Sequence, residues 1–264
     1  MVERNGLPDR TREIRIANWV IGFSLGYLLA SFIVPALLPA GTVPELSGRA
    51  NAFDYMFKDA SWGDWGNEPH SEDGSMGHDQ ANHGGKFAWS ELDLFSALIY
   101  GFGDINCHQK HERSWVINGN QMPVCTRDIG IFAGIFAGGM IFRRFGLNRW
   151  TVRDSILSVF PDNKVEQIYY SDYRFMLAFG GIALLLLPTA IDGGLQAITN
   201  YESTNLKRLV TGFIMGMGLG TLFSAVFAAN PKQFDYDASK VKLPANARLV
   251  PSENVEHIQD NEEE

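Results

Sequence analysis

Charged residues are missing from four long segments of the chain. No Asp, Glu, Lys or Arg occurs in residues 16–44, 129–142, 175–191 or 209–230. A water-soluble fold interrupts segments of this length with charges on its solvent-facing side, so their absence argues against a soluble enzyme. The sequence therefore predicts an all-α, polytopic integral membrane protein whose partner is the lipid bilayer and whose location is the cell membrane.

Cysteine and positive charge are also scarce. The 264 residues include two cysteines, which are too few for a scaffold held together by disulfides. The formal net charge is −8, which argues against nucleic acid as a partner. The sequence has no phosphate-binding glycine loop, dinucleotide-binding fingerprint or nucleophile elbow, so none of these motifs assigns an activity.

Four transmembrane helices are expected. The first covers residues 16–40, and its apolar part of about 24 residues is roughly 36 Å long as a helix, enough to cross a bilayer. The second centres on 129–142, which is apolar over a short length, and the third and fourth cover 175–191 and 209–229. The apolar stretch 92–102 is too short to span and is predicted to be an interfacial or re-entrant segment.

The basic residues predict the orientation of these helices. With a cytoplasmic N-terminus (1–15), four spans also place the 143–174 loop and the tail (231–264) inside. These three segments hold 14 of the 22 Lys and Arg residues, in agreement with the positive-inside rule. Residues 41–91 then form an extracytoplasmic flexible loop, 92–230 form a membrane domain with the second to fourth helices, and the acidic cytoplasmic tail is expected to be disordered.

Glycine recurs every four residues in three of the predicted spans. Such rows let helix backbones approach closely, so we expect a tight bundle, and the same Gly-xxx-Gly faces are compatible with a homo-oligomer. The alternative is that glycine is simply common in membrane helices. The rows are Gly22 and Gly26 with Ala30, then Gly130, Gly134 and Gly138, and finally Gly212, Gly216 and Gly220.

Both cysteines lie in one polar segment, residues 104–128, which the predicted topology places on the extracytoplasmic side. Its distinctive residues are Cys107-His108-Gln109, Glu112-Arg113-Ser114, Asn118-Gly119, Gln121 to Cys125, Arg127 and Gly130. A second block contains Pro188, Ile191-Asp192-Gly193, Gln196, Ser203-Thr204-Asn205, Arg208 and Thr211-Gly212. Together the blocks resemble the family of predicted membrane proteins known as domain of unknown function 2085. The resemblance covers about residues 92–230 and implies a membrane architecture and a site, but no reaction.

The family pattern implies a metal site. It combines Cys-His with Cys-x-x-Cys, which are ligand types of zinc. In this chain the implied set is Cys107, His108, Cys125 and Asp128, since Asp128 stands where the family has its last cysteine. An Asp oxygen also binds zinc, but we expect a lower affinity than with a third thiolate. Adjacent ligands are awkward around one tetrahedral ion, so His111 is an alternative to His108. The implied cofactor is zinc or another divalent metal.

Two other chemistries of the cysteines stay open. A Cys107–Cys125 disulfide would contribute roughly 3 kcal/mol by closing a loop on an oxidising side of the membrane. Alternatively, the thiols are free or redox-active. The disulfide would make the two residues an inert structural link.

Asp192 is the most distinctive polar residue of the second block. A carboxylate near the C-terminal end of a membrane helix needs a cationic partner, and Arg127 or Arg208 would serve. The alternative is that Asp192-Gly193-Gly194 only ends the helix, with Gly193 as a left-handed cap, and that Ser203-Thr204-Asn205 only begins the next one. With four spans, both blocks reach one membrane face. The candidate site residues are then Arg113, Arg127, Asp192, Gln196, Asn205 and Arg208, beside the Cys-His motif.

A second tract rich in His and acidic residues lies in the 67–86 part of the long loop. His70, His78 and His83 are candidates for loose binding of a divalent metal. Their irregular spacing favours a solvated flexible loop instead.

Three functions are compatible with the sequence. The first is a membrane-embedded enzyme, redox protein or metal protein that uses the Cys-His motif, with Asp192 and Arg208 orienting a polar group. The second is a structural or assembly protein with an inert disulfide. The third is a small transporter, which is disfavoured because no predicted span has a charge at mid-depth.

Overall fold

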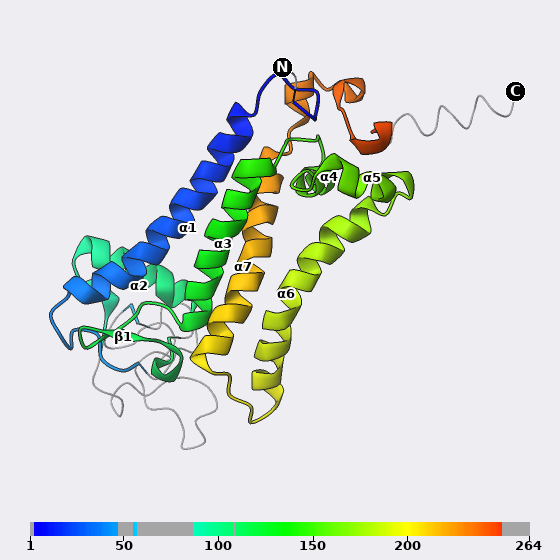
Figure 1. Cartoon of the computed structure of the whole chain (residues 1–264). Coiled ribbons are helices and arrows are strands. Elements are labelled where there is room, and N and C mark those ends of the chain that lie inside the picture. The colour runs from blue at the N-terminus through cyan, green and yellow to red at the C-terminus, as the bar shows by residue number, and fades with distance from the viewer. Residues whose placement is uncertain (1–2, 47–54, 57–86, 108, 250–264) are drawn as a thin grey trace, which may run out of the picture. The chain divides into compact units, whose positions relative to one another are not determined.

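The computed structural model describes residues 3–46, 55–56, 87–107 and 109–249. Within these residues the chain is mostly helical, with seven α-helices and one two-stranded hairpin (Figure 1). The chain divides into two compact units. The first comprises Met1–Gly22, Gly134–Pro188 and Met215–Glu264, and the second comprises Phe23–Ala133 and Thr189–Ile214.

Three of the described helices are long and apolar enough to cross a membrane. They are α1 (Thr11–Leu37), α6 (Arg174–Ile198) and α7 (Asn205–Ala228), with 27, 25 and 24 residues. The first, third and fourth predicted spans fall largely within them. The second predicted span lies in α3 (Thr126–Phe145), a helix of 20 residues with charges in its first and last turns, which is not among the three. The described residues therefore contain three candidate membrane spans.

The remaining elements are shorter. They are α2 (Leu94–Asn106), α4 (Val152–Leu157), α5 (Asp162–Tyr170), the strands β1 (Val116–Ile117) and β2 (Asn120–Gln121), and 3-10 helices at Trp89–Glu91, His111–Arg113, Pro231–Phe234, Ala238–Lys240 and Pro244–Asn246. α2 begins at an N-cap, Asp93, whose side chain accepts hydrogen bonds from the backbone of Phe95 and Ser96. At 13 residues, or about 20 Å, α2 is shorter than a bilayer is thick.

α6 continues past the end that the sequence predicts for it. Pro188 lies inside the helix, which ends at Ile198, so Asp192 and Gly193 are helical residues. The interpretation of Gly193 as a left-handed cap is therefore wrong. Thr189 follows the proline, and its hydroxyl donates to the backbone oxygen of Thr211 on α7. This extension of α6 adds about two turns, which contain the polar residues Asp192 and Gln196.

Arginines at the start of the chain bind the ends of other helices in the first unit. The Arg10 guanidinium donates to the backbone oxygens of Arg143, Arg144 and Gly146 at the end of α3. Arg12 donates to the backbone oxygen of Ala228, the last residue of α7. These carbonyls have no partner within their own helices, and they carry the negative end of the helix dipole. The arginines therefore stabilise two helix ends.

The segment 231–249, which the sequence predicts as part of a disordered tail, has structure. It contains three short 3-10 helices and buries Phe234, Val241 and Leu243 in the apolar core of the first unit. Asn148 also binds there, because its side chain donates to the backbone of Asn230 and the side chain of Gln233. Apolar contacts spaced irregularly along a polar segment give no periodic signal in the sequence. Residues 250–264 lie outside the described residues.

The hairpin of the second unit fixes the polar segment around the cysteines. Asn118 and Gly119 form its turn with positive φ angles of 50° and 69°, as an Asn-Gly hairpin turn requires. On β2, the Gln121 side chain is buried, donates to the backbone oxygen of Gln109 and accepts from the backbone of Leu46. Tyr100 on α2 donates to the backbone oxygen of Gln121. These bonds join the segment after α2 to the segment before α3.

Glycines let α3 and α7 approach closely in both units. A methyl group on Gly130 would overlap the backbone of Leu209, and one on Gly212 would overlap the backbone of Arg127. Gly138 and Gly220 meet the opposite helix in the same way. The glycine row of α1 differs, because no atom of the described residues lies within 4 Å of an added methyl group at Gly22 or Gly26.

Candidate metal centre

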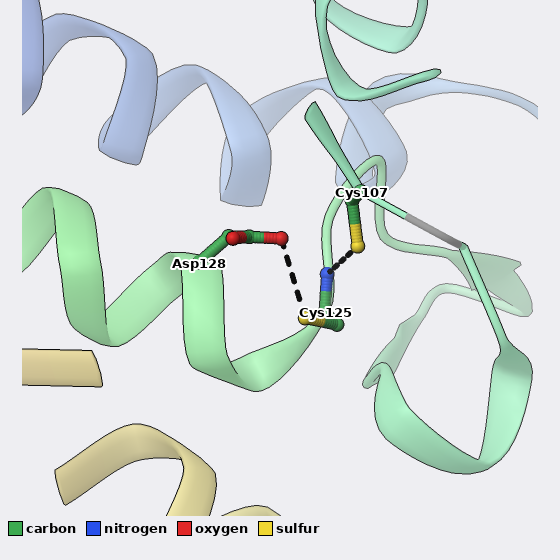
Figure 2. A group of neighbouring side chains, drawn as sticks. All are labelled: Cys107, Cys125 and Asp128. Carbon is green, nitrogen blue, oxygen red and sulfur yellow. Dashed lines mark hydrogen bonds between the residues drawn. The ribbon is translucent and has the colours of Figure 1, made fainter. Parts of the chain in front are cut away.

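Cys107, Cys125 and Asp128 form the group with metal-ligating side chains that the structure brings together (Figure 2). Cys107 is the C-cap residue of α2, Cys125 directly precedes α3, and Asp128 lies in the first turn of α3. One ligand atom from each residue lies within 4.8 Å of the others. Cys107 is buried, whereas Cys125 and Asp128 are partly exposed. The group is therefore anchored on two helix ends and open on one side.

Hydrogen bonds hold the three residues in place. The Cys125 backbone donates to the Cys107 sulfur at 3.1 Å, and the Cys125 thiol donates to an Asp128 oxygen at 3.2 Å (Figure 2). The two cysteines are not joined in a disulfide. Two thiols and a carboxylate thus converge without a covalent link.

The environment of Cys107 disfavours a thiolate in the absence of a cation. Its pKa is raised well above the ordinary value by the hydrogen bond with Cys125, by burial and by the negative charge of Asp128. The thiol is therefore protonated at neutral pH. A metal ion reverses this balance, since a coordinating thiol is deprotonated.

The donor set suits a zinc ion. Two ligand atoms of a tetrahedral zinc site with bonds of about 2.0 to 2.3 Å lie roughly 3.3 to 3.8 Å apart. The three ligand atoms lie within 4.8 Å of one another, and rotation of the partly exposed Cys125 and Asp128 side chains would bring them to that spacing. Three protein ligands leave a fourth position for water or another small ligand.

A second polar cluster lies in the same unit and joins the two sequence blocks. Arg127 on α3 forms an ion pair with Asp192 on α6. Asp192 also accepts hydrogen bonds from Gln196 at 3.0 Å and from the hydroxyl of Tyr201 at 3.1 Å. The Arg208 guanidinium donates to the Gln196 side chain at 2.8 Å.

Glu202 completes this cluster. One of its oxygens accepts from Arg113 and the other from Arg208, each at 2.9 Å. Partial burial opposes ionisation, but the hydrogen bonds and charges of the two arginines outweigh it and lower the pKa of Glu202. The sequence analysis missed Glu202 and Tyr201. An inventory of charges could have found Glu202, because it is the acid nearest in sequence to Arg208 in the second block.

A pocket of about 190 Å³ lies between the thiols and the arginines. The residues that line it come from both sequence blocks: Asn106, Cys107, Gln109, Lys110, Arg113, Cys125, Arg127, Asp128 and Arg208. The structure therefore brings most of the predicted site residues to one cavity, with Asp192 and Gln196 bound to its arginines.

The remaining predicted residues have other positions. The Asn205 side chain accepts a hydrogen bond from Thr126, which joins the beginnings of α7 and α3. Thr204 accepts from the Lys207 backbone, as expected of a residue that precedes a helix. His111 lies 3.9 Å from Glu45 and 3.7 Å from Glu112 and is not part of the metal-ligating group. His108 and the loop histidines His70, His78 and His83 lie outside the described residues.

Comparisons with known proteins match the region of the site. The model of a family described as "Predicted membrane protein (DUF2085)" matches residues 107–222, which include the three metal-ligating residues and the whole arginine cluster. An uncharacterized protein of Methanocaldococcus jannaschii is 30% identical over 149 residues, 56% of this chain and 77% of that relative. An uncharacterized protein of Methanothermobacter thermautotrophicus is 31% identical over 116 residues, 44% of this chain and 82% of that relative. No solved structure matches.

Proposed function

The chain belongs to the DUF2085 family of predicted membrane proteins, and from this premise we propose that it is a membrane metal-binding protein. It holds zinc, or another divalent ion with the same ligand preference, through Cys107, Cys125 and Asp128. The observation that carries the proposal is the convergence of these three ligand atoms within 4.8 Å at the ends of two helices. Arg113, Arg127, Asp192, Gln196 and Arg208 surround the open side of the ion and orient a polar ligand there.

Burial and charge support this role. The side chains of Asp192 and Arg208 are 8% and 3% exposed, which costs desolvation energy that a purely structural surface does not require. Polar side chains of this kind gather beside a cavity and beside potential ligands of a metal, an arrangement typical of functional sites.

The proposed membrane arrangement is a multi-pass protein with four spans. We add α3 to the three candidate spans α1, α6 and α7, since its central residues 129–142 carry no charge and its glycines contact α7. Both chain ends are cytoplasmic, and the Cys-His motif faces outward, as the excess of Lys and Arg in the proposed inside segments favours. Reporter fusions test this: activity of a cytoplasmic reporter is expected after Arg144, and of an exported reporter after Gly194. The reverse pattern contradicts the arrangement.

Metal analysis of the purified full chain tests the metal site. The protein is prepared in detergent with a reductant, loaded with zinc, washed free of excess metal and assayed for metal and for reactive thiols. We expect one tightly held zinc ion per chain and protection of both thiols. The variants C107S, C125S and D128N are expected to bind zinc more weakly, so that the wash removes it, and H111A is a control that keeps the ion because His111 lies outside the ligating group.

The alternatives give different results. A Cys107–Cys125 disulfide with no retained metal in protein prepared without reductant, and no zinc uptake after reduction, overturns the metal site and favours the structural role. Equal zinc retention by D128N and the unmodified chain overturns the assignment of Asp128. Loss of zinc from H111A would show that His111, the alternative to His108, is a zinc ligand.

A further inference from the structure

Four cationic side chains line the pocket beside the metal-ligating group: Lys110, Arg113, Arg127 and Arg208. The one acidic side chain in its lining is Asp128. Two more carboxylates, Asp192 and Glu202, bind the arginines but do not line the pocket. The cluster therefore contains four cations and three carboxylates, and the wall of the cavity itself is strongly positive.

The carboxylates do not neutralise the cations one for one. Arg127 has Asp192 to itself, but Arg113 and Arg208 share Glu202, and the Glu202 side chain is 66% exposed, so solvent weakens its interaction. Lys110 has no ion pair with any side chain of the described residues. The lining of the pocket therefore keeps a net positive charge, and one of its cations, Arg208, is almost completely buried.

The arginines also retain unused hydrogen-bond donors. Arg113, Arg127 and Arg208 each bind their carboxylates through the Nη2 atom. The Nε atom of Arg127 is buried and has no acceptor among the described residues. A guanidinium has five N–H donors and no acceptor, so a ligand that supplies acceptor oxygens suits the cluster.

Two helix ends add to the positive potential. α3 and α7 begin side by side, because Thr126 donates to Asn205 and the backbones meet at Gly130 and Gly212. Each beginning carries the positive end of a helix dipole. Both ends and the cationic side chains therefore favour an anion at the same place.

The size of the pocket limits the anion. Pockets for drug-sized ligands measure roughly 300 to 1,000 Å³, whereas this one is about 190 Å³. That volume admits a single compact group with a few ordered waters. A phosphate group fits these limits and offers more acceptor oxygens and more charge than a carboxylate.

We propose that this pocket is an oxyanion site that binds a phosphate group, either as inorganic phosphate or as the terminal phosphate of a lipid headgroup. The arginines Arg113, Arg127 and Arg208 and the ammonium of Lys110 donate to its oxygens. This anion site is separate from the proposed metal function and does not require a bound metal, since the four cationic side chains alone would bind the phosphate.

Binding of inorganic phosphate to the full chain in phosphatidylcholine nanodiscs tests the proposal. Metal is removed with a chelator and thiols are kept reduced, so that a failure of the metal site does not affect the readout. Equilibrium dialysis at low ionic strength is expected to show saturable binding of one phosphate per chain. R113Q and R208Q should each weaken it by about tenfold, whereas E202Q, which releases two guanidiniums, should strengthen it several-fold. R143Q, which removes an exposed arginine outside the pocket, is the matched control and should bind as the unmodified chain does.

A second titration identifies the source of the phosphate. Short-chain phosphatidic acid has a terminal phosphate, and short-chain phosphatidylcholine does not. Tighter binding of phosphatidic acid than of inorganic phosphate, with competition between the two, assigns the site to a lipid headgroup, and the reverse order assigns it to a free phosphate. Absence of saturable binding of either probe overturns the proposal. Phosphate binding that is the same in R113Q, R208Q, E202Q and the unmodified chain also overturns the proposal. If R208Q does not fold because Arg208 is buried, R113Q alone tests the role of the arginines.

Discussion

Arg127 and Asp192 form an ion pair although they lie 65 residues apart on different helices. The Asp192 carboxylate also accepts hydrogen bonds from Gln196 and Tyr201, so each of its two oxygens has a partner. Arg127 comes from the sequence block that contains the cysteines, and Asp192 comes from the second block. The pair is therefore a direct contact between two blocks that lie far apart in the sequence.

Removing one partner of this pair is expected to destabilise the protein more than removing both. R127Q leaves Asp192 as a buried charge without its cation, which costs roughly 3 kcal/mol. R127Q/D192N leaves two neutral side chains and should recover a large part of the loss. Thermal unfolding in detergent measures both variants. A double variant less stable than R127Q would contradict a direct interaction.

The contact between α3 and α7 depends on glycine at specific positions. G130A and G212A each place a methyl group against the backbone of the opposite helix and should cost about 1 to 3 kcal/mol. G180A and G26A introduce the same methyl group where no atom of the described residues lies within 4 Å. These controls should be neutral or slightly stabilising, because alanine favours helix. Equal effects of the four substitutions in thermal unfolding would show that helix packing does not use the glycine row.

Arg10 is expected to matter for stability as well as for orientation. R10Q removes hydrogen bonds to four backbone oxygens at the end of α3 and should cost about 1 to 2 kcal/mol. R15Q removes the same charge from an exposed side chain and is the control. If Arg10 and Arg15 served only to set the membrane orientation, R10Q and R15Q would unfold at the same temperature.

Glu202 predicts a specific dependence of stability on pH. Because its pKa is lowered in the folded protein, its ion pairs stabilise the fold above its ordinary value of about 4.3 and are lost as pH falls through the lower folded value. Since Glu202 is largely exposed, the effect should be below about 1 kcal/mol. The melting temperature of the unmodified chain should therefore exceed that of E202Q at neutral pH, and the difference should vanish in acid. A difference that persists below this range would require another origin.

The sequence predicted the family, and the matching family model and relatives confirm it. The family resemblance also implied a ligand set of Cys107, His108, Cys125 and Asp128, and three of these four residues lie together in the structure. Asp192 and its two possible arginines were likewise found as unpaired charges beside apolar runs.

The remaining features depend on three-dimensional contacts that no local pattern encodes. The continuation of α6 through Pro188 could not be predicted, since proline ordinarily ends or kinks a helix. The burial of Phe234 depends on a core formed by distant residues. Glu202 looked like an ordinary loop acid until Arg113 and Arg208 were seen on either side of it.

Zinc K-edge X-ray absorption of the zinc-loaded full chain tests the metal site most directly. The account predicts a shell of two sulfur atoms at about 2.3 Å and a shell of oxygen or nitrogen atoms at about 2.0 Å, with one sulfur lost in C107S or C125S. Zinc surrounded by oxygen and nitrogen alone, or a sulfur shell that neither substitution changes, would contradict it.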